Sequence, residues 1–264
     1  GGGTVINSGS ITGVTSANNP SLTDGISIFN QFDQDMETYV ASVTNSEDGV
    51  ITGAARGVIV SGGGTVDNAG TIVGGDAGVL VQNGNVDEEG NPTADIAAVV
   101  TNNGTIEGTA GDGVTVGDGL TSATVTNGGS ISGGRDGIHV DMMEAGVATI
   151  ANLDGGEITG AGSGIEVQFG GLDLVNDGTI RGEGRGNGIS AAPDGGVAIA
   201  GSSSTIVNNG TIAGAQFGIV TYPYMGVVGT VMDTSIVNTG TITGENDDGI
   251  RLAGGGTVVN SGTI

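Results

Sequence analysis

The feature that most constrains the fold is a short motif that recurs along the whole chain. It is clearest at 206–214, where the sequence reads Ile-Val-Asn-Asn-Gly-Thr-Ile-Ala-Gly. An aliphatic residue stands two positions before each motif asparagine, and an isoleucine follows shortly after it. Copies recur at intervals of about 22–38 residues, and repetition on this scale indicates a solenoid in which each unit packs on the next.

Each repeat contains three short segments that read as β-strands. The first ends at the asparagine, the second holds the isoleucine, and the third has the form Gly-(Ile/Val)-x-(Val/Ile/Leu), as at 164–167. All three segments are rich in β-branched residues, alternate between apolar and polar positions and are separated by glycine. We therefore predict an all-β fold, a parallel β-helix of about nine to ten coils with three strands per coil. We expect residues 1–264 to form a single β-helix segment.

The motif asparagines are predicted to form a structural ladder rather than a chemical site. Strand alternation points Val5, Asn7, Ile11, Ile26 and Ile28 toward the core. Stacked asparagines can bond through their amides from coil to coil, as polar ladders do in cross-β structures. The predicted ladder consists of Asn7, Asn45, Asn68, Asn102, Asn127, Asn152, Asn176, Asn208, Asn238 and Asn260.

Glycine is abundant, with 57 residues in 264, and falls at the expected corners of the coils. Several acidic or amide residues directly precede the glycine of the third segment. They are Asp24, Asp112, Asp136, Asn187 and Asp248. Asp-Gly and Asn-Gly pairs form turns, so we interpret these side chains as turn residues rather than ligands.

Composition excludes several functions. The net charge is −24, with five arginines and no lysine, which argues against nucleic-acid partners and anionic membrane surfaces. Without cysteine the chain has no disulfides or thiolate metal sites. No stretch is apolar for long enough to span a membrane, so we expect no direct membrane insertion in this segment. The chain begins and stops inside a repeat without polar caps, and we expect it to be an excerpt of a longer repeat protein.

Longer links interrupt the repeat mainly between the third strand of one coil and the first strand of the next. They lie at 29–42, 82–99, 192–205 and 222–235, with a smaller loop at 14–23. Most insertions therefore leave the solenoid at one corner, which is typical of a binding edge. The aromatic residues in them either form a recognition surface or fold back over the strands. These candidate interaction residues are Phe29, Phe32, Tyr39, Tyr222 and Tyr224.

One outward column of the first strands is apolar in the second half of the chain. It consists of Val175, Val207, Val237 and Val259. Such a stripe is covered by a loop or buried against a partner chain. The links at 192–205 and 222–235 flank the stripe, and we favour cover by these segments.

Two sets of polar residues are candidate sites. His139 and Glu166 share a column on neighbouring coils, and we interpret them as a surface ion pair rather than a catalytic pair. Arg181 and Arg185 stand close to Glu183 in the sequence, and this spacing predicts a surface salt bridge. We predict no catalytic residues and no cofactor.

Calcium is a weaker alternative. Acidic side chains in the links offer the hard oxygen ligands that calcium prefers. They lack EF-hand spacing, however, and solvated acidic loops are the favoured interpretation. The calcium candidates are Asp33, Asp35, Asp87, Glu88 and Glu89, and Glu37 and the Asp247–Asp248 pair offer the same type of ligand.

The segments at 4–13 and 205–212 resemble the β-helical passenger region of bacterial autotransporters and related large surface repeat proteins. This resemblance covers essentially the whole chain. It implies a right-handed β-helix, in agreement with the strong right-handed preference of parallel crossovers. It also implies export across the outer membrane and an extracellular location at the surface of a Gram-negative cell.

Three functions follow as hypotheses. The first is a non-enzymatic structural or adhesive rod, a filament or surface-layer component that displays loops. Its partners would be other copies, lateral or end to end, or a glycan or protein of a cell surface. The second is a carbohydrate-active β-helix enzyme, a polysaccharide lyase or hydrolase. The third is a calcium-stabilised surface-layer or filament subunit.

Overall fold

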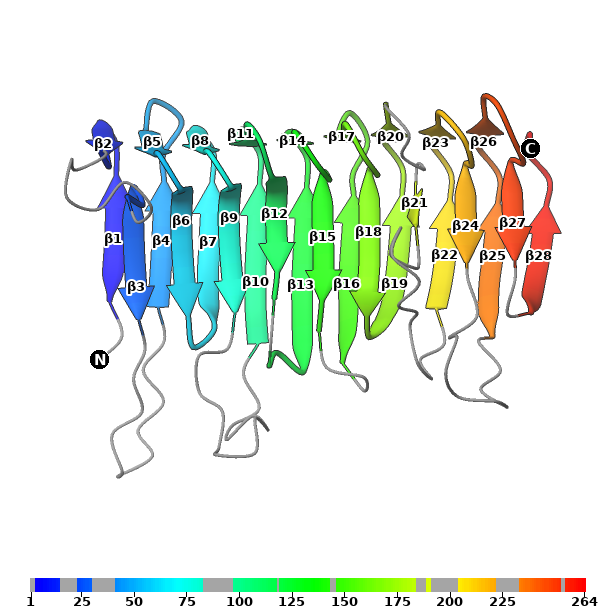
Figure 1. The fold of residues 1–264 in the computed structure, drawn as a ribbon, viewed down its shortest axis with the longest axis horizontal. Coiled ribbons are helices and arrows are strands. Elements are labelled where there is room, and N and C mark those ends of the chain that lie inside the picture. Colours follow the sequence, from blue (N-terminus) through cyan, green and yellow to red (C-terminus); the bar gives the residue numbers. More distant parts are fainter. Residues whose placement is uncertain are drawn as a thin grey trace.

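The chain is a right-handed parallel β-helix with three parallel sheets (Figure 1). A computed structural model describes residues 3–14, 23–29, 41–82, 97–117, 119–142, 146–183, 189–190, 204–221, 233–252 and 255–264. Within these ranges every regular element is a strand. Successive strands enter the first, second and third sheets in turn, so the all-β fold class predicted from the repeat is confirmed. The described ranges contain no helix with the length and apolar character needed to cross a bilayer.

The first sheet contains the strands that end at the motif asparagines. They are β1 (Thr4–Asn7), β4 (Ala41–Asn45), β7 (Gly64–Asn68), β10 (Ala97–Asn102), β13 (Ser122–Asn127), β16 (Val147–Asn152), β19 (Gly171–Asn176), β22 (Ser204–Asn208), β25 (Thr234–Asn238) and β28 (Gly256–Asn260).

The second sheet contains the isoleucine segments. They are β2 (Ser10–Thr12), β5 (Val50–Gly53), β8 (Thr71–Gly74), β11 (Thr105–Gly108), β14 (Ser130–Gly133), β17 (Glu157–Gly160), β20 (Thr179–Gly182), β23 (Thr211–Gly214) and β26 (Thr241–Gly244).

The third sheet contains the segments that follow a glycine. They are β3 (Ile26–Phe29), β6 (Arg56–Ser61), β9 (Ala77–Gln82), β12 (Asp112–Val116), β15 (Ile138–Asp141), β18 (Ile165–Phe169), β21 (Ile189–Ser190), β24 (Ile219–Thr221) and β27 (Ile250–Leu252).

The core consists of columns of equivalent aliphatic side chains. In the second sheet Ile106 pairs in register with Ile72 on one side and Ile131 on the other. In the first sheet Val100 likewise pairs with Val66. All of these side chains are almost completely buried, and burial of aliphatic surface is the main term that holds successive coils together.

The asparagine ladder runs without a break through all ten strands of the first sheet. From Asn45 to Asn238 each ladder asparagine is fully buried. Each Nδ2 donates to the Oδ1 of the next ladder asparagine, as in the 2.8 Å bond from Asn68 to Asn102 and the 2.9 Å bond from Asn102 to Asn127. From Asn7 to Asn238 each Nδ2 also lies beside two backbone carbonyl oxygens at the corner, as Asn68 does beside those of Gly70 and Thr105. The amides thereby satisfy polar groups that the core would otherwise leave unpaired.

The long links leave from one corner, between a third-sheet strand and the next first-sheet strand. They correspond to 30–40, 83–96, 191–203 and 222–233. Phe32, Tyr39, Tyr222 and Tyr224 lie outside the described residues, as do the calcium candidates Asp33, Asp35, Asp87, Glu88 and Glu89. Phe29 is not a loop residue: it ends β3, pairs with Ser61 and is 57% exposed.

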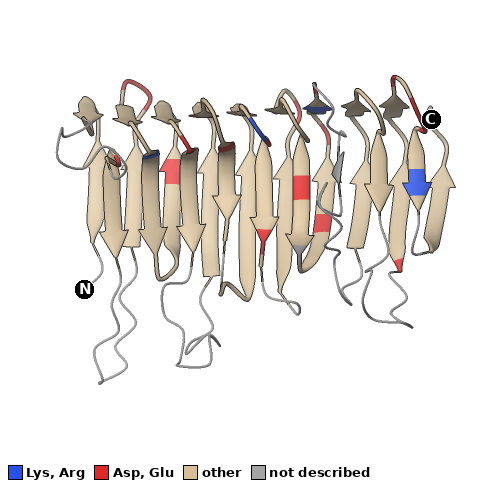
Figure 2. Cartoon of the chain, in the orientation of Figure 1, with Lys and Arg blue, Asp and Glu red and all other residues tan. Residues whose placement is uncertain are grey.

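The four stripe valines form one continuous column on β19, β22, β25 and β28. Val175 and Val259 are 44% and 57% exposed, whereas Val207 and Val237 are half-buried. The segments expected to cover this column, at 192–205 and 222–235, lie mostly outside the described residues, so the cover stays a prediction. Figure 2 shows few charged residues on the strand faces of the described part, where charge lies mainly at the turns.

Candidate functional site

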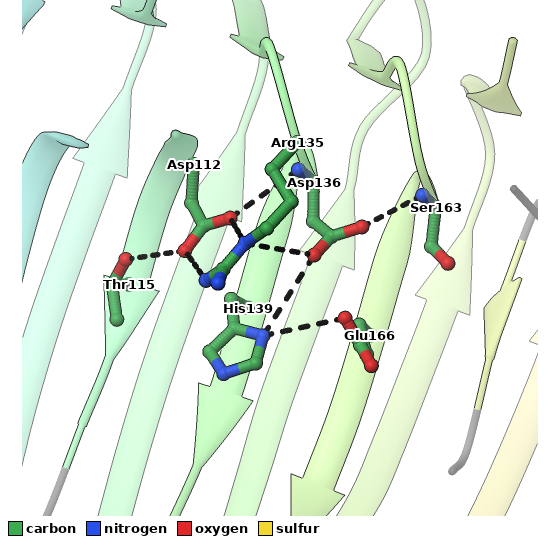
Figure 3. Close-up of polar contacts among 7 residues, drawn as sticks. All are labelled: Asp112, Thr115, Arg135, Asp136, His139, Ser163 and Glu166. Atoms are coloured by element: carbon green, nitrogen blue, oxygen red, sulfur yellow. Dashed lines mark hydrogen bonds and ion pairs between the residues drawn. The ribbon is translucent and has the colours of Figure 1, made fainter. Parts of the chain in front are cut away.

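A compact polar cluster lies where the coils turn into the third sheet, on β12, β15 and β18 (Figure 3). Asp112 is the first residue of β12, and Arg135 and Asp136 lie in the turn between β14 and β15. His139 is on β15 and Glu166 on β18. The cluster therefore draws on three consecutive coils.

A local rule of the repeat brings these side chains together. The residue before the glycine of the third segment contacts the outward residue three positions later. Ser27 donates to Asp24 at 2.7 Å, and Thr115 donates to Asp112 at 3.0 Å. In the middle of the chain the same geometry places His139 beside Asp136, with 3.9 Å between Nδ1 and Oδ2.

Arg135 forms a two-pronged ion pair with Asp112. Its Nε donates to Oδ1 at 2.7 Å and its Nη2 donates to Oδ2. Asp112 is almost completely buried, whereas the Arg135 side chain is 57% exposed. The bond to Asp112 raises the pKa of Arg135, against the opposing effect of burial. This fork geometry is the strong form of an arginine–carboxylate contact.

Among the carboxyl groups of the cluster, Asp136 has the largest shift in pKa. Burial, followed by the proximity of Glu166, raises its pKa to about 8. Its Oδ1 accepts a 2.7 Å hydrogen bond from the backbone N–H of Ser163. Its Oδ2 accepts no hydrogen bond, although Arg135 Nε lies 3.4 Å away. A carboxyl group with this pKa is largely protonated at neutral pH.

His139 and Glu166 lie side by side, as predicted, but not at the surface. The side chains are 10% and 17% exposed, and His139 Nδ1 lies 3.5 Å from Glu166 Oε2. The interpretation as a surface pair is therefore wrong, because Arg135 and Asp136 also surround the imidazole. Ile59 and Val220 in the same column are buried too.

The two groups perturb each other. Burial is the largest single effect on His139 and disfavours the charged imidazolium, but the contact with Glu166 and the negative charges of Asp112 and Glu166 together outweigh it and raise the pKa of His139. Burial is also the largest single effect on Glu166 and disfavours its carboxylate, but the contacts with His139 and Asp136 and the positive charges of His139 and Arg135 together outweigh it and lower the pKa of Glu166.

Sequence reasoning missed Asp112, Arg135 and Asp136 as parts of this site. The interpretation of Asp112 and Asp136 as turn residues is incomplete, since both side chains are buried and bonded across coils. A sequence pattern could have indicated that these aspartates contact the third strand. Asp-Gly-(Ile/Val)-x recurs at 24–27, 112–115, 136–139 and 248–251, so each aspartate stands three residues before an outward position.

The remaining predicted polar contacts lie away from the cluster. Arg181 pairs with Glu183 at 3.6 Å and with Glu245 at 3.3 Å, whereas Arg185 lies outside the described residues. Asp248 binds Arg251 at 2.9 Å. A hollow lined in part by Asp154, Glu157 and Asp177 lies at a different corner, between the first and second sheets.

Removing the arginine should expose how much the cluster depends on it. Arg135→Met is expected to destabilise the fold by about 2–3 kcal/mol, because Asp112 would be left as a buried carboxylate without its cation. Arg181→Met removes an arginine from exposed ion pairs and should cost less than about 1 kcal/mol. Urea unfolding of the two variants measures the difference, and equal shifts would contradict the assigned role of Arg135.

Comparisons of the chain with models of protein families, with curated proteins and with solved structures gave no match.

Proposed function

We propose that the chain is the stem of an extracellular structural or adhesive protein, at the surface of a Gram-negative cell, and has no enzymatic role. The observation that carries the proposal is the unbroken asparagine ladder, which fixes one register through every coil of the first sheet. Such a stem holds its shape while the links between coils vary in length and sequence. A constant stem with variable links suits a rod that displays segments to partners.

Two further features support a role in contact with other molecules. The outward valines of β19, β22, β25 and β28 form an apolar column on the first sheet, within which Val175 is 44% exposed. Another copy or a cell-surface protein or glycan could pack on this column. The net charge of −24 keeps the rods apart at low ionic strength. Lateral association should therefore increase as salt screens that charge.

Attachment and turnover can be tested on the same preparation. Beads coated with the protein are counted on cells and on immobilised glycans, while free protein is incubated with the same glycans in solution. We expect attachment without release of oligosaccharides. Beads coated with Val175→Thr protein are the matched control, since this change removes apolar surface and keeps the β-branched shape. Absence of any attachment or salt-dependent association would contradict the proposal.

The second candidate is a carbohydrate-active enzyme, and the buried acidic cluster is the observation that favours it. A carboxyl group with a pKa of about 8 beside an ionised Glu166 divides acid and base roles between two groups. Access is the difficulty, because the Asp136 side chain is only 3% exposed. Oligosaccharide release that Glu166→Gln and His139→Gln both abolish would favour the enzyme over the stem.

A further inference from the structure

We propose that Asp112, Asp136, His139 and Glu166 form a binding site for a divalent transition-metal ion of the zinc type. The first three each offer a ligand atom, and these atoms all lie within 4.8 Å of one another. Glu166 approaches the same imidazole nitrogen from the next coil, at 3.5 Å. The site would join the fourth, fifth and sixth coils through side chains on β12, β15 and β18.

Two buried atoms at the centre of the cluster have no hydrogen-bond partner. They are Asp136 Oδ2 and His139 Nδ1, on side chains that are 3% and 10% exposed. Both face the same space, as Figure 3 shows. Buried polar atoms without a hydrogen-bond partner reduce the stability of the fold. Here both atoms, a carboxylate oxygen and an imidazole nitrogen, are of the kind that bind metal ions. A cation between them would satisfy both at once.

The distances suit a small tetrahedral ion. With zinc bonds of about 2.1 Å, two ligand atoms in a tetrahedral site lie about 3.4 Å apart. The 3.5 Å from His139 Nδ1 to Glu166 Oε2 already meets this spacing. The 3.9 Å from His139 Nδ1 to Asp136 Oδ2 needs a movement of only a few tenths of an ångström.

The charge and donor types select the class of metal. A metal binds its ligands in their deprotonated forms, so Asp136 would release its proton when the ion binds. With a neutral imidazole, the three carboxylates and one guanidinium of the occupied site then leave an excess of two negative charges, which a divalent cation would neutralise. One imidazole with carboxylates is a ligand set for zinc and neighbouring transition metals. Calcium prefers sites made entirely of oxygen ligands and should bind poorly here.

Arg135 does not need to leave the site. It engages both oxygens of Asp112 and is half-exposed. The metal would rest mainly on Asp136, His139 and Glu166, and Asp112 would join when the guanidinium swings toward solvent. Because Arg135 Nε also lies 3.4 Å from Asp136 Oδ2, arginine and metal would compete mainly for Asp112 and to a lesser extent for Asp136.

The chain offers a sharp test because His139 is its only histidine and it has no cysteine. Chelator-treated protein labelled with ¹⁵N is titrated with zinc chloride while the imidazole nitrogens are followed by NMR. We expect one zinc per chain, a large shift of Nδ1 and a proton fixed on Nε2. Calorimetry on the same sample gives the stoichiometry, and saturating zinc should raise Tm by about 5 °C or more.

Two variants locate the site, and a third serves as the matched control. Asp136→Asn keeps the side-chain shape and should weaken zinc binding about tenfold or more, and His139→Gln should do the same. Asp67→Asn removes an exposed carboxylate from β7 and should leave binding unchanged. The proposal fails if equimolar zinc leaves the imidazole nitrogens of the wild-type protein unmoved. It also fails if folded His139→Gln protein binds zinc as tightly as wild type.

Discussion

Asn102→Asp is expected to destabilise the β-helix by about 4 kcal/mol or more, since it places an unpaired charge in the core. Asn102 Nδ2 now donates toward Asn127 Oδ1 at 2.9 Å and lies 3.2 and 3.0 Å from the carbonyl oxygens of Gly104 and Ser130. A carboxylate oxygen in the same place would face three acceptors and donate to none. Urea unfolding followed by circular dichroism measures the loss.

The neighbouring asparagine supplies a control with the same chemical change. Asn103 is exposed at the corner, one residue beyond the fully buried Asn102. Asn103→Asp should therefore change stability by less than about 0.5 kcal/mol. The carboxyl group introduced by Asn102→Asp should also become less harmful at low pH, where the protonated acid regains an O–H donor for Asn127. Equal losses in the two variants would show that the ladder contributes nothing specific.

The ladder and the aliphatic columns could be predicted because a solenoid turns sequence repetition into spatial stacking. Asn68, Asn102 and Asn127 occupy the same place in three repeats, so any parallel coil that keeps register must stack them. The links differ in length between these residues, yet the register holds. Strand topology depends on the repeated segments, and insertions at one corner do not disturb it.

The buried cluster could be predicted only in part. His139 and Glu166 share one position of the repeat, so their proximity follows from the columns. The burial of His139 does not, because alternation assigns a face of a strand and says nothing of what surrounds it. Asp112 and Asp136 occur in sequences typical of ordinary turns, and only the coordinates reveal that both side chains are buried.

The Arg135 contact was harder still to anticipate. Arg135 reaches back by one coil to Asp112 rather than pairing only with a neighbour in its own turn. A long side chain can reach partners on several coils, so the repeat pattern predicts its contacts far less well than those of a short side chain. The buried polar cluster of this chain thus lies where individual long or charged residues interrupt the repeat pattern.

Gly129→Ala is expected to destabilise the fold by about 3 kcal/mol through overpacking. A Cβ atom at Gly129 would lie 2.1 Å from the carbonyl oxygen of Gly104 and 2.8 Å from the carbonyl carbon of Asn103. Both are backbone atoms of the preceding coil. The Gly104 oxygen also accepts a 2.8 Å hydrogen bond from Ser130 N, so relief of the clash would require the two coils to separate. Thermal and urea unfolding both measure the effect.

The adjacent glycine provides the matched control. A Cβ atom at Gly128 would meet Asn103 Oδ1 at 3.0 Å, with Leu153 Cδ1 and Asn102 O farther away at 3.7 and 3.9 Å. The nearest atom belongs to an exposed side chain that can rotate away. Gly128→Ala should therefore be neutral or stabilise by up to about 1 kcal/mol, because alanine reduces the freedom of the unfolded chain. Equal unfolding of the two variants would show that the coils have space for a methyl group at this corner. Close contact between the backbones of the two coils would then not be the reason for glycine at position 129.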